Sequence, residues 1–99
     1  MISRHWRGLA KANRAEEYAE HLRAETFPSL NAIPGFIGAS ILRRPLPEGV
    51  EFLVVTQWSS LEAIHAFAGA RVETAVVPHK VQDMMLEYEL SARHYEVVL

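Results

Sequence analysis

The sequence predicts one α+β domain with the element order β-α-β-β-α-β. Apolar residues recur at helical spacing after residue 13. Two strand-like stretches, residues 36–44 and 50–58, are separated by a short turn segment. The length of 99 residues suits a single hydrophobic core, so residues 1–99 are taken as one domain. This element order is typical of the ferredoxin-like fold, an antiparallel sheet with both helices on one face.

The first strand is expected at residues 2–9, which contain Ile, Trp and Leu and stop near a helix start. The helix is predicted to begin with a capping box, in which Asn13 covers a free backbone N–H and Glu16 reaches back. Pro28 is expected to kink or end this helix near residues 26–27. The spacing i, i+3, i+4 and i+7 predicts the buried face of the helix, formed by Ala15, Tyr18, Ala19 and Leu22.

Residues 36–44 and 50–58 are predicted to form an antiparallel hairpin. The turn between them contains two prolines, which fix φ, and Gly49, which permits positive φ. Leu53 points to one face of the second strand and Val54 to the other, and both faces are apolar. The helices can cover only one face. The other face is therefore expected to pack against the same sheet of a second copy, giving a two-fold homodimer and a dimeric α+β barrel.

The remaining elements are predicted from capping and breaking residues. Ser59 with Glu62 is expected to form a second capping box, and Gly69 to end that helix. Residues 71–88 are helix-like but interrupted by proline, so broken helical turns are expected there. Residues 92–99 are predicted to form the last strand.

Composition excludes several classes of protein. Ten Lys and Arg against twelve Asp and Glu give a net charge of −2, without the basic excess of a nucleic-acid surface. The absence of cysteine excludes disulfides, thiolate metal sites and a cysteine nucleophile. No metal-binding histidine pattern, signal sequence or apolar run long enough for a membrane span is found. The expected location is therefore the cytoplasm.

Three segments carry a recognisable pattern, and together with the element order they cover essentially the whole chain. They are Pro34-Gly35-Phe36-Ile37-Gly38, residues 52–58 continuing through Ser59-Ser60-Leu61-Glu62-Ala63-Ile64 to Phe67, and Arg93-His94-Tyr95-Glu96-Val97. These segments resemble the antibiotic biosynthesis monooxygenase family, within the dimeric α+β barrel superfamily. The family contains cofactor-independent oxygenases of polycyclic phenols, haem-degrading oxygenases and proteins without known activity. The resemblance therefore implies the fold more specifically than the reaction.

The resemblance places Trp58 in the wall of a pocket between sheet and helices, where its ring suits an aromatic ligand. The alternative is a core tryptophan that anchors the second helix. His5 falls near the asparagine that haem-degrading members use, and that asparagine is absent here. His5 could still act as a base, and Arg7, on the same strand face, could hold an anionic substrate oxygen. Solvent exposure of His5 and an ion pair for Arg7 are the competing interpretations.

His79 lies in a segment comparable to the one that carries the axial histidine of haem-degrading relatives. Tyr18 is expected to put its hydroxyl into the pocket or to be a core residue, and Met84 to lie near the pocket mouth or to fill the core. His21 and His65 are expected to face solvent.

Three functions follow from these residues. The first is a homodimeric oxygenase that needs no cofactor and acts on a phenol- or quinol-like aromatic molecule, with catalytic roles for His5, Arg7 and Trp58. The second is haem binding or degradation, with His79 as the ligand. The third is a non-catalytic small-molecule-binding or structural dimer.

Overall fold

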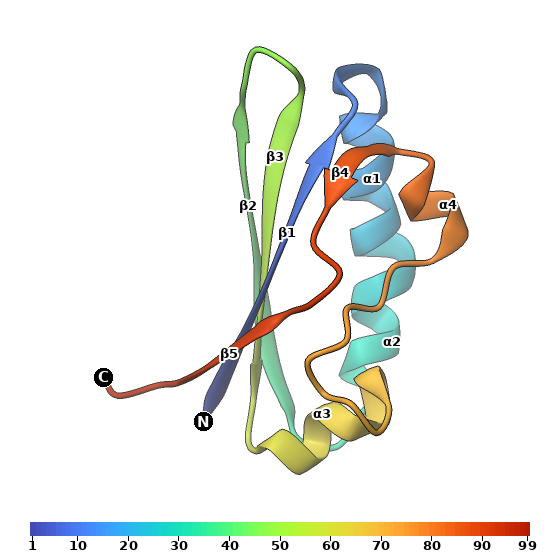
Figure 1. Ribbon diagram of the computed structural model, residues 1–99. Coiled ribbons are helices and arrows are strands. Elements are labelled where there is room, and N and C mark those ends of the chain that lie inside the picture. The colour runs from blue at the N-terminus through green and yellow to red at the C-terminus, as the bar shows by residue number, and fades with distance from the viewer.

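The computed structural model describes all 99 residues as a five-stranded antiparallel sheet with helices on one face (Figure 1). The strands are β1 (Ile2–Ala10), β2 (Phe36–Pro45), β3 (Val50–Trp58), β4 (Met85–Tyr88) and β5 (Arg93–Glu96). The α-helices are α1 (Ala15–His21), α2 (Phe27–Asn31), α3 (Leu61–Ala68) and α4 (His79–Gln82). A 3₁₀ turn, η1 (Ala12–Arg14), precedes α1, and a π-helical turn, η2 (Leu22–Thr26), joins α1 to α2.

The sheet order β2-β3-β1-β4 confirms the predicted ferredoxin-like α+β fold. Strand β1 lies in the middle and pairs along its whole length with β3, from Ile2 opposite Trp58 to Ala10 opposite Val50. Its other edge pairs first with β4, near Leu9, and then with β5, near Arg4. The last strand, expected at residues 92–99, is present as the shorter β5, and β4 is an additional strand on the same edge of β1.

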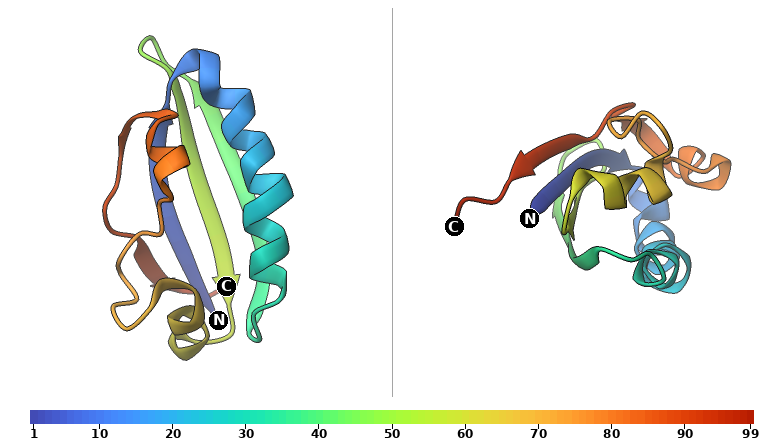
Figure 2. Two further views of the ribbon diagram at one scale, coloured as in Figure 1. Left: turned by 90° about the vertical axis from the view of Figure 1, so that its right-hand side faces the viewer. Right: turned by 90° about the horizontal axis from the view of Figure 1, so that it is seen from below.

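The long helical segment runs along the sheet, as the left view of Figure 2 shows. The predicted helix face is confirmed: Tyr18 and Leu22 are each 3% exposed. The predicted capping box is wrong, because η1 occupies residues 12–14 and no side chain caps the start of α1. Glu16 instead pairs with Arg43, 2.7 Å away.

Pro28 does not end the helical segment, and the segment keeps its direction along the sheet. It lies in the first turn of α2, where a missing N–H is tolerated. The π-helical turn at Leu22–Thr26 comes directly before it. This wider turn absorbs the hydrogen-bond change that proline imposes, so the helical segment continues to Asn31.

Helix α3 is capped by Ser60, one residue later than expected. The Ser60 Oγ accepts a hydrogen bond from the backbone N–H of Ala63 at 3.3 Å. Gly69 ends the helix with φ of 86°, as predicted. The expectation of broken helical turns over 71–88 is mostly wrong, because only His79–Gln82 is helical and Met85–Tyr88 is strand β4. Pairing with the edge of β1 overrides the helical composition of this segment.

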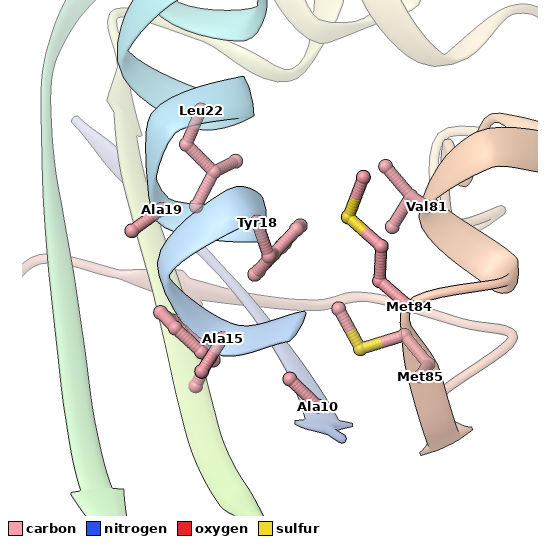
Figure 3. Packing of buried hydrophobic residues seen from close by; sticks show 9 residues of the cluster. Ala10, Ala15, Tyr18, Ala19, Leu22, Val81, Met84 and Met85 are labelled. Atoms are coloured by element: carbon pink, nitrogen blue, oxygen red, sulfur yellow. The ribbon is translucent and has the colours of Figure 1, made fainter. Parts of the chain in front are cut away.

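The core consists of two clusters between the sheet and the helices. One joins α1 to β3 and to the segment around α4, and Figure 3 shows Tyr18 pointing from α1 toward Val81 and Met84. The second is formed by Leu30, Trp58 and Ile64, all at most 1% exposed, and fixes α2 and α3 at the other end of β3. Together the two clusters fix the α1–α2 segment and α3 at separate places on the same sheet face.

The opposite sheet face carries no helix. Leu42 lies beside Leu53 and Ser40 beside Val55 on this face, and Leu42 is 54% exposed. Tyr95, in β5, is 49% exposed. The apolar character predicted for this face is therefore present in the folded chain.

Candidate functional site

A cavity opens between the helix-facing side of the sheet and the helices. Its volume is about 70 Å³, enough for several water molecules, and it opens to solvent through a mouth. Nine of its fourteen lining residues are hydrophobic. The lining residues come from β1, β3, the long helical segment, α3 and the segment before α4: Arg4, Trp6, Tyr18, His21, Leu22, Thr26, Leu30, Val54, Thr56, Phe67, Val76, Val77, Pro78 and Val81. A mostly apolar wall with a few polar groups is the usual form of a small-molecule site.

Arg4 is the charged group of the cavity wall. It is only 4% exposed, and its guanidinium lies 5.6 Å from the centre of the Phe67 ring. One Nη donates to the Val72 carbonyl and contacts His94 Nε2 at 2.8 Å, while the other donates to the Thr74 carbonyl at 2.9 Å. Burial lowers the pKa of Arg4. These bonds fix the guanidinium and attach the segment after α3 to β1.

His21 is the imidazole that lines the cavity. Its side chain is 9% exposed, and its Nδ1 lies 3.1 Å from Glu25 Oε2. Glu25 also accepts a hydrogen bond from Lys80, and this bond, followed by that with His21, lowers the pKa of the Glu25 carboxyl. The carboxylate holds the ring through Nδ1 and leaves Nε2 without a protein partner. The expectation that His21 faces solvent is therefore wrong, whereas His65 is exposed as expected.

Tyr18 is the sequence-predicted ligand-binding residue that does line the cavity. Its ring packs edge-on against Phe52 at 4.9 Å and lies parallel to His21 at 6.4 Å. Its hydroxyl makes no hydrogen bond within the protein, and no fully enclosed side-chain oxygen or nitrogen lacks a partner. The hydroxyl therefore touches open space, and burial raises its pKa, so it remains a neutral donor.

Trp58 is fully enclosed and is not part of the cavity lining. Its Nε1 donates to Thr56 Oγ1 at 2.8 Å, and its ring stacks on Phe67 at 6.1 Å. Both partners line the cavity. The structure thus places Trp58 behind the wall, as the core tryptophan of the alternative interpretation, where it positions Thr56 and Phe67.

His5 and Arg7 lie on the opposite sheet face from the cavity. They are paired with Val55 and Leu53, whereas the cavity residues Arg4 and Trp6 alternate with them along β1. Burial, and then the charge of Arg93, lowers the pKa of His5, whose ring lies 4.9 Å from that of Tyr95 in a tilted arrangement.

Arg7 is held by an ion pair with Glu51 at 2.6 Å. His5, Arg7 and Trp58 were expected to share one pocket. The structure does not bring them together, because the alternation of a strand sends neighbouring side chains to opposite faces.

His79 and Met84 also lie outside the cavity lining. His79 is exposed at the first turn of α4. Met84 is 3% exposed in the first core cluster, as its core interpretation expected. The haem ligand predicted from the sequence is therefore not at this site.

Arg4, Trp6, His21, Thr26 and Thr56 are cavity residues that sequence reasoning missed. The sequence carried a signal for His21 and only a partial one for Arg4 and Trp6. Alternation along β1 separates Arg4 and Trp6 from His5, and His21 stands three residues after Tyr18, on the same helix face.

The π-helical turn could not be foreseen, although such turns are frequent at functional sites. No group of three or more His, Asp or Glu side chains is arranged to hold a metal ion. No helix of the chain is long and apolar enough to span a membrane.

The fold and the cavity together define a ferredoxin-like α+β domain with a mostly apolar cavity between its sheet and its helices. The chain belongs to the antibiotic biosynthesis monooxygenase family, whose model matches residues 1–76. This confirms the family that the sequence segments resembled. A comparison with curated protein sequences found no significant match.

Several solved structures share the fold. A variant of the haem degrader MhuD, bound to two manganese protoporphyrin IX molecules per active site, is 26% identical, with a TM-score of 0.71, and covers 100% of this chain and 96% of its own. MhuD from Mycobacterium tuberculosis with two haems bound is 25% identical, with a TM-score of 0.60, over 100% of this chain and 97% of its own. A candidate antibiotic biosynthesis monooxygenase from Deinococcus radiodurans is 16% identical, with a TM-score of 0.70, over 98% and 92%, and supports the fold alone.

Proposed function

We propose that this protein is an oxygenase that binds an aromatic small molecule in the cavity and oxidises it with dioxygen, without a resident cofactor. The observation that carries the proposal is the cavity wall itself. Trp6, Phe67 and the neighbouring aliphatic side chains form apolar surfaces, while Tyr18 and His21 supply polar atoms on the helix side. A planar ring can enter from the mouth and lie between these surfaces.

His21 is the group that can take a proton from such a substrate. Its Nε2 is free, and its Nδ1 is held by the Glu25 carboxylate, which orients the ring. Removing a phenolic proton gives an electron-rich anion that reacts with dioxygen directly. A ring carbon that carries two hydrogens becomes a carbonyl. One oxygen atom enters the product, and the other leaves as water with those two hydrogens. The mostly apolar wall shields the bound ring from water.

Oxygen consumption tests this proposal. An oxygen electrode would follow anthrone-type substrates with the unmodified protein, with His21→Ala, and with His65→Ala as the matched control. His65 is an exposed histidine of α3 outside the cavity. We expect a chelator to have no effect and His21→Ala to lower kcat by about 10²–10⁴. Equal rates for His21→Ala and His65→Ala would remove His21 from the mechanism, and no uptake with any substrate would refute oxygenation.

We also propose that the helix-free sheet face forms a homodimer, as the sequence pattern indicated. Its exposed Leu42 neighbours Leu53, and Tyr95 packs against His5 at the β5 edge. Two such faces can pack into a closed barrel with two-fold symmetry. Light scattering should give twice the chain mass for the unmodified protein and the monomer mass for Leu42→Glu. A monomer for the unmodified protein would refute the dimer.

Haem binding is the second candidate function, and the similarity to the haem-bound MhuD structures favours it. His79 does not fit as the ligand, because it lies outside the cavity; the imidazole that could ligate iron there is His21. The cavity is open at its mouth, so a tetrapyrrole held there would extend out of it. Hemin titration should give a Soret shift that His21→Ala abolishes and His79→Ala keeps, and absence of any shift would exclude this function.

A further inference from the structure

Arg4 is a buried cation without an anion. It is 4% exposed, yet it takes part in none of the ion pairs of the chain, so no carboxylate oxygen lies within 4.0 Å of its guanidinium. The other arginines on β1 and β2 each have a glutamate partner, as in the pair of Arg43 with Glu16. Buried charges in proteins are normally paired, because removing a charge from water is costly. Arg4 therefore departs from the pattern of its own sheet.

The charged groups around Arg4 do not neutralise it. His94 contacts it at 2.8 Å, and burial followed by the Arg4 charge lowers the pKa of His94, which keeps this ring neutral. Glu73 acts on the neighbouring His94, where its charge opposes this lowering of the pKa, and its carboxylate pairs with Arg71 at 3.4 Å rather than with Arg4. The two remaining partners are the Val72 and Thr74 carbonyls. The net positive charge therefore stays at the cavity wall.

Part of the guanidinium has no partner in the protein. Arginine has five N–H donors, and the bonds to Val72, Thr74 and His94 leave Nε–H and one further N–H unused. Since no fully enclosed side-chain nitrogen lacks a hydrogen bond, the unused Nε touches open space, and Arg4 lines the cavity. The aromatic face of Phe67 lies beside it, with 5.6 Å between the guanidinium carbon and the ring centre. The cation and an apolar ring platform thus occupy the same wall.

We propose that the natural ligand is an aromatic carboxylate whose acid group binds Arg4 while its ring lies against Phe67 and Trp6. A carboxylate supplies the missing negative charge and can accept two N–H bonds from one guanidinium. The inference rests on the proposed binding of an aromatic molecule in the cavity, and it adds the charge and functional group of that molecule. Arg4 then acts as a specificity-determining residue that selects acids over neutral rings.

The test uses two ligands that differ mainly in charge, 2-naphthoate and 2-naphthamide, at neutral pH. Binding is followed by quenching of the fluorescence of Trp6, which lines the cavity, and by calorimetry. On the unmodified protein we expect naphthoate to bind about 10-fold to 100-fold more tightly, the range for a hydrogen-bonded charge. Arg4→Met, which keeps the apolar stem, should remove this preference. Arg23→Met, at an exposed arginine of the helical segment outside the cavity, should keep it.

Each outcome decides the proposal. Equal affinities on the unmodified protein overturn the role of Arg4 but leave an aromatic-binding cavity, so the proposed function survives. If neither ligand binds, both the inference and the proposed aromatic site fail. The comparison of the two ligands needs no variant, so the proposal remains falsifiable if Arg4→Met does not fold. A naphthoate preference that persists in folded Arg4→Met also overturns it.

Discussion

Replacing Gly35 with alanine tests how the chain connects α2, β2 and α3. Gly35 has φ of +93°, a backbone conformation that side-chain-bearing residues rarely adopt. A Cβ added there would lie 2.5 Å from the Ala63 Cβ and 2.8 Å from the Ser59 Oγ. Two costs therefore add in Gly35→Ala, backbone strain and a steric clash with α3.

Two other glycines separate these costs. Gly69 has φ of +86° but open space around its would-be Cβ, so Gly69→Ala should show the backbone strain alone, about 1–3 kcal/mol. Gly35→Ala adds an overpacking cost of about 1–3 kcal/mol, giving roughly 2–6 kcal/mol in total. Gly38 has neither positive φ nor a neighbour within 4 Å. Alanine there, inside β2, should be neutral or stabilise by about 0.5–1 kcal/mol.

Urea unfolding followed by circular dichroism, at one protein concentration for all variants, measures these free energies. The double variant Gly35→Ala with Ala63→Gly removes the nearest clashing atom and should recover part of the loss, beyond the cost of about 1 kcal/mol for glycine in a helix. If Gly35→Ala is no more destabilising than Gly69→Ala, the close approach of Gly35 to α3 does not constrain the fold, and the reasoning is refuted.

Three further predictions concern capping and pH. Ser60→Ala should lower the free energy of unfolding by about 1 kcal/mol, whereas Asn13→Ala should leave it nearly unchanged in the same urea assay, because only Ser60 caps a helix. Arg44 and then Arg7 lower the pKa of Glu51 to about 2, so its contribution to stability is present above pH 4.5 and lost as the pH falls toward 2. Glu51→Gln should flatten the acid limb of a pH–stability curve, and an unchanged limb contradicts the ion pairs. The pKa of His94 is lowered below 6.5 by burial, so stability falls as the pH drops from 6.5 toward that lower pKa; His94→Gln should weaken this loss in thermal unfolding scans at pH 5 and 7.

Much of the candidate site could have been found in the sequence by a stricter use of periodicity. The helix face of Tyr18 predicted a position in the pocket or in the core, and His21, which lines the cavity, follows on that face three residues later. In β1, the choice of His5 over Arg4 depends on which of two alternating faces turns toward the helices. Both faces of β1 carry polar and apolar residues, so the local pattern does not decide between them. Arg4 pairs with Thr56, which lies on the same sheet face as the buried Trp58. This pairing shows that Arg4, and not His5, is on the face that turns toward the helices.

The sequence by itself determined the ferredoxin-like order, the hairpin of β2 and β3, the buried face of α1 and the family, because periodicity and turn residues act over short distances. Only the tertiary structure decided where the last third of the chain lies and which side chains meet. Residues 71–88 are mostly not helical because Met85–Tyr88 pair with the free edge of β1, which supplies their backbone hydrogen-bond partners. The same pairing holds Val76, Val77 and Val81 over the sheet, and it completes a cavity around a buried arginine that no local pattern revealed.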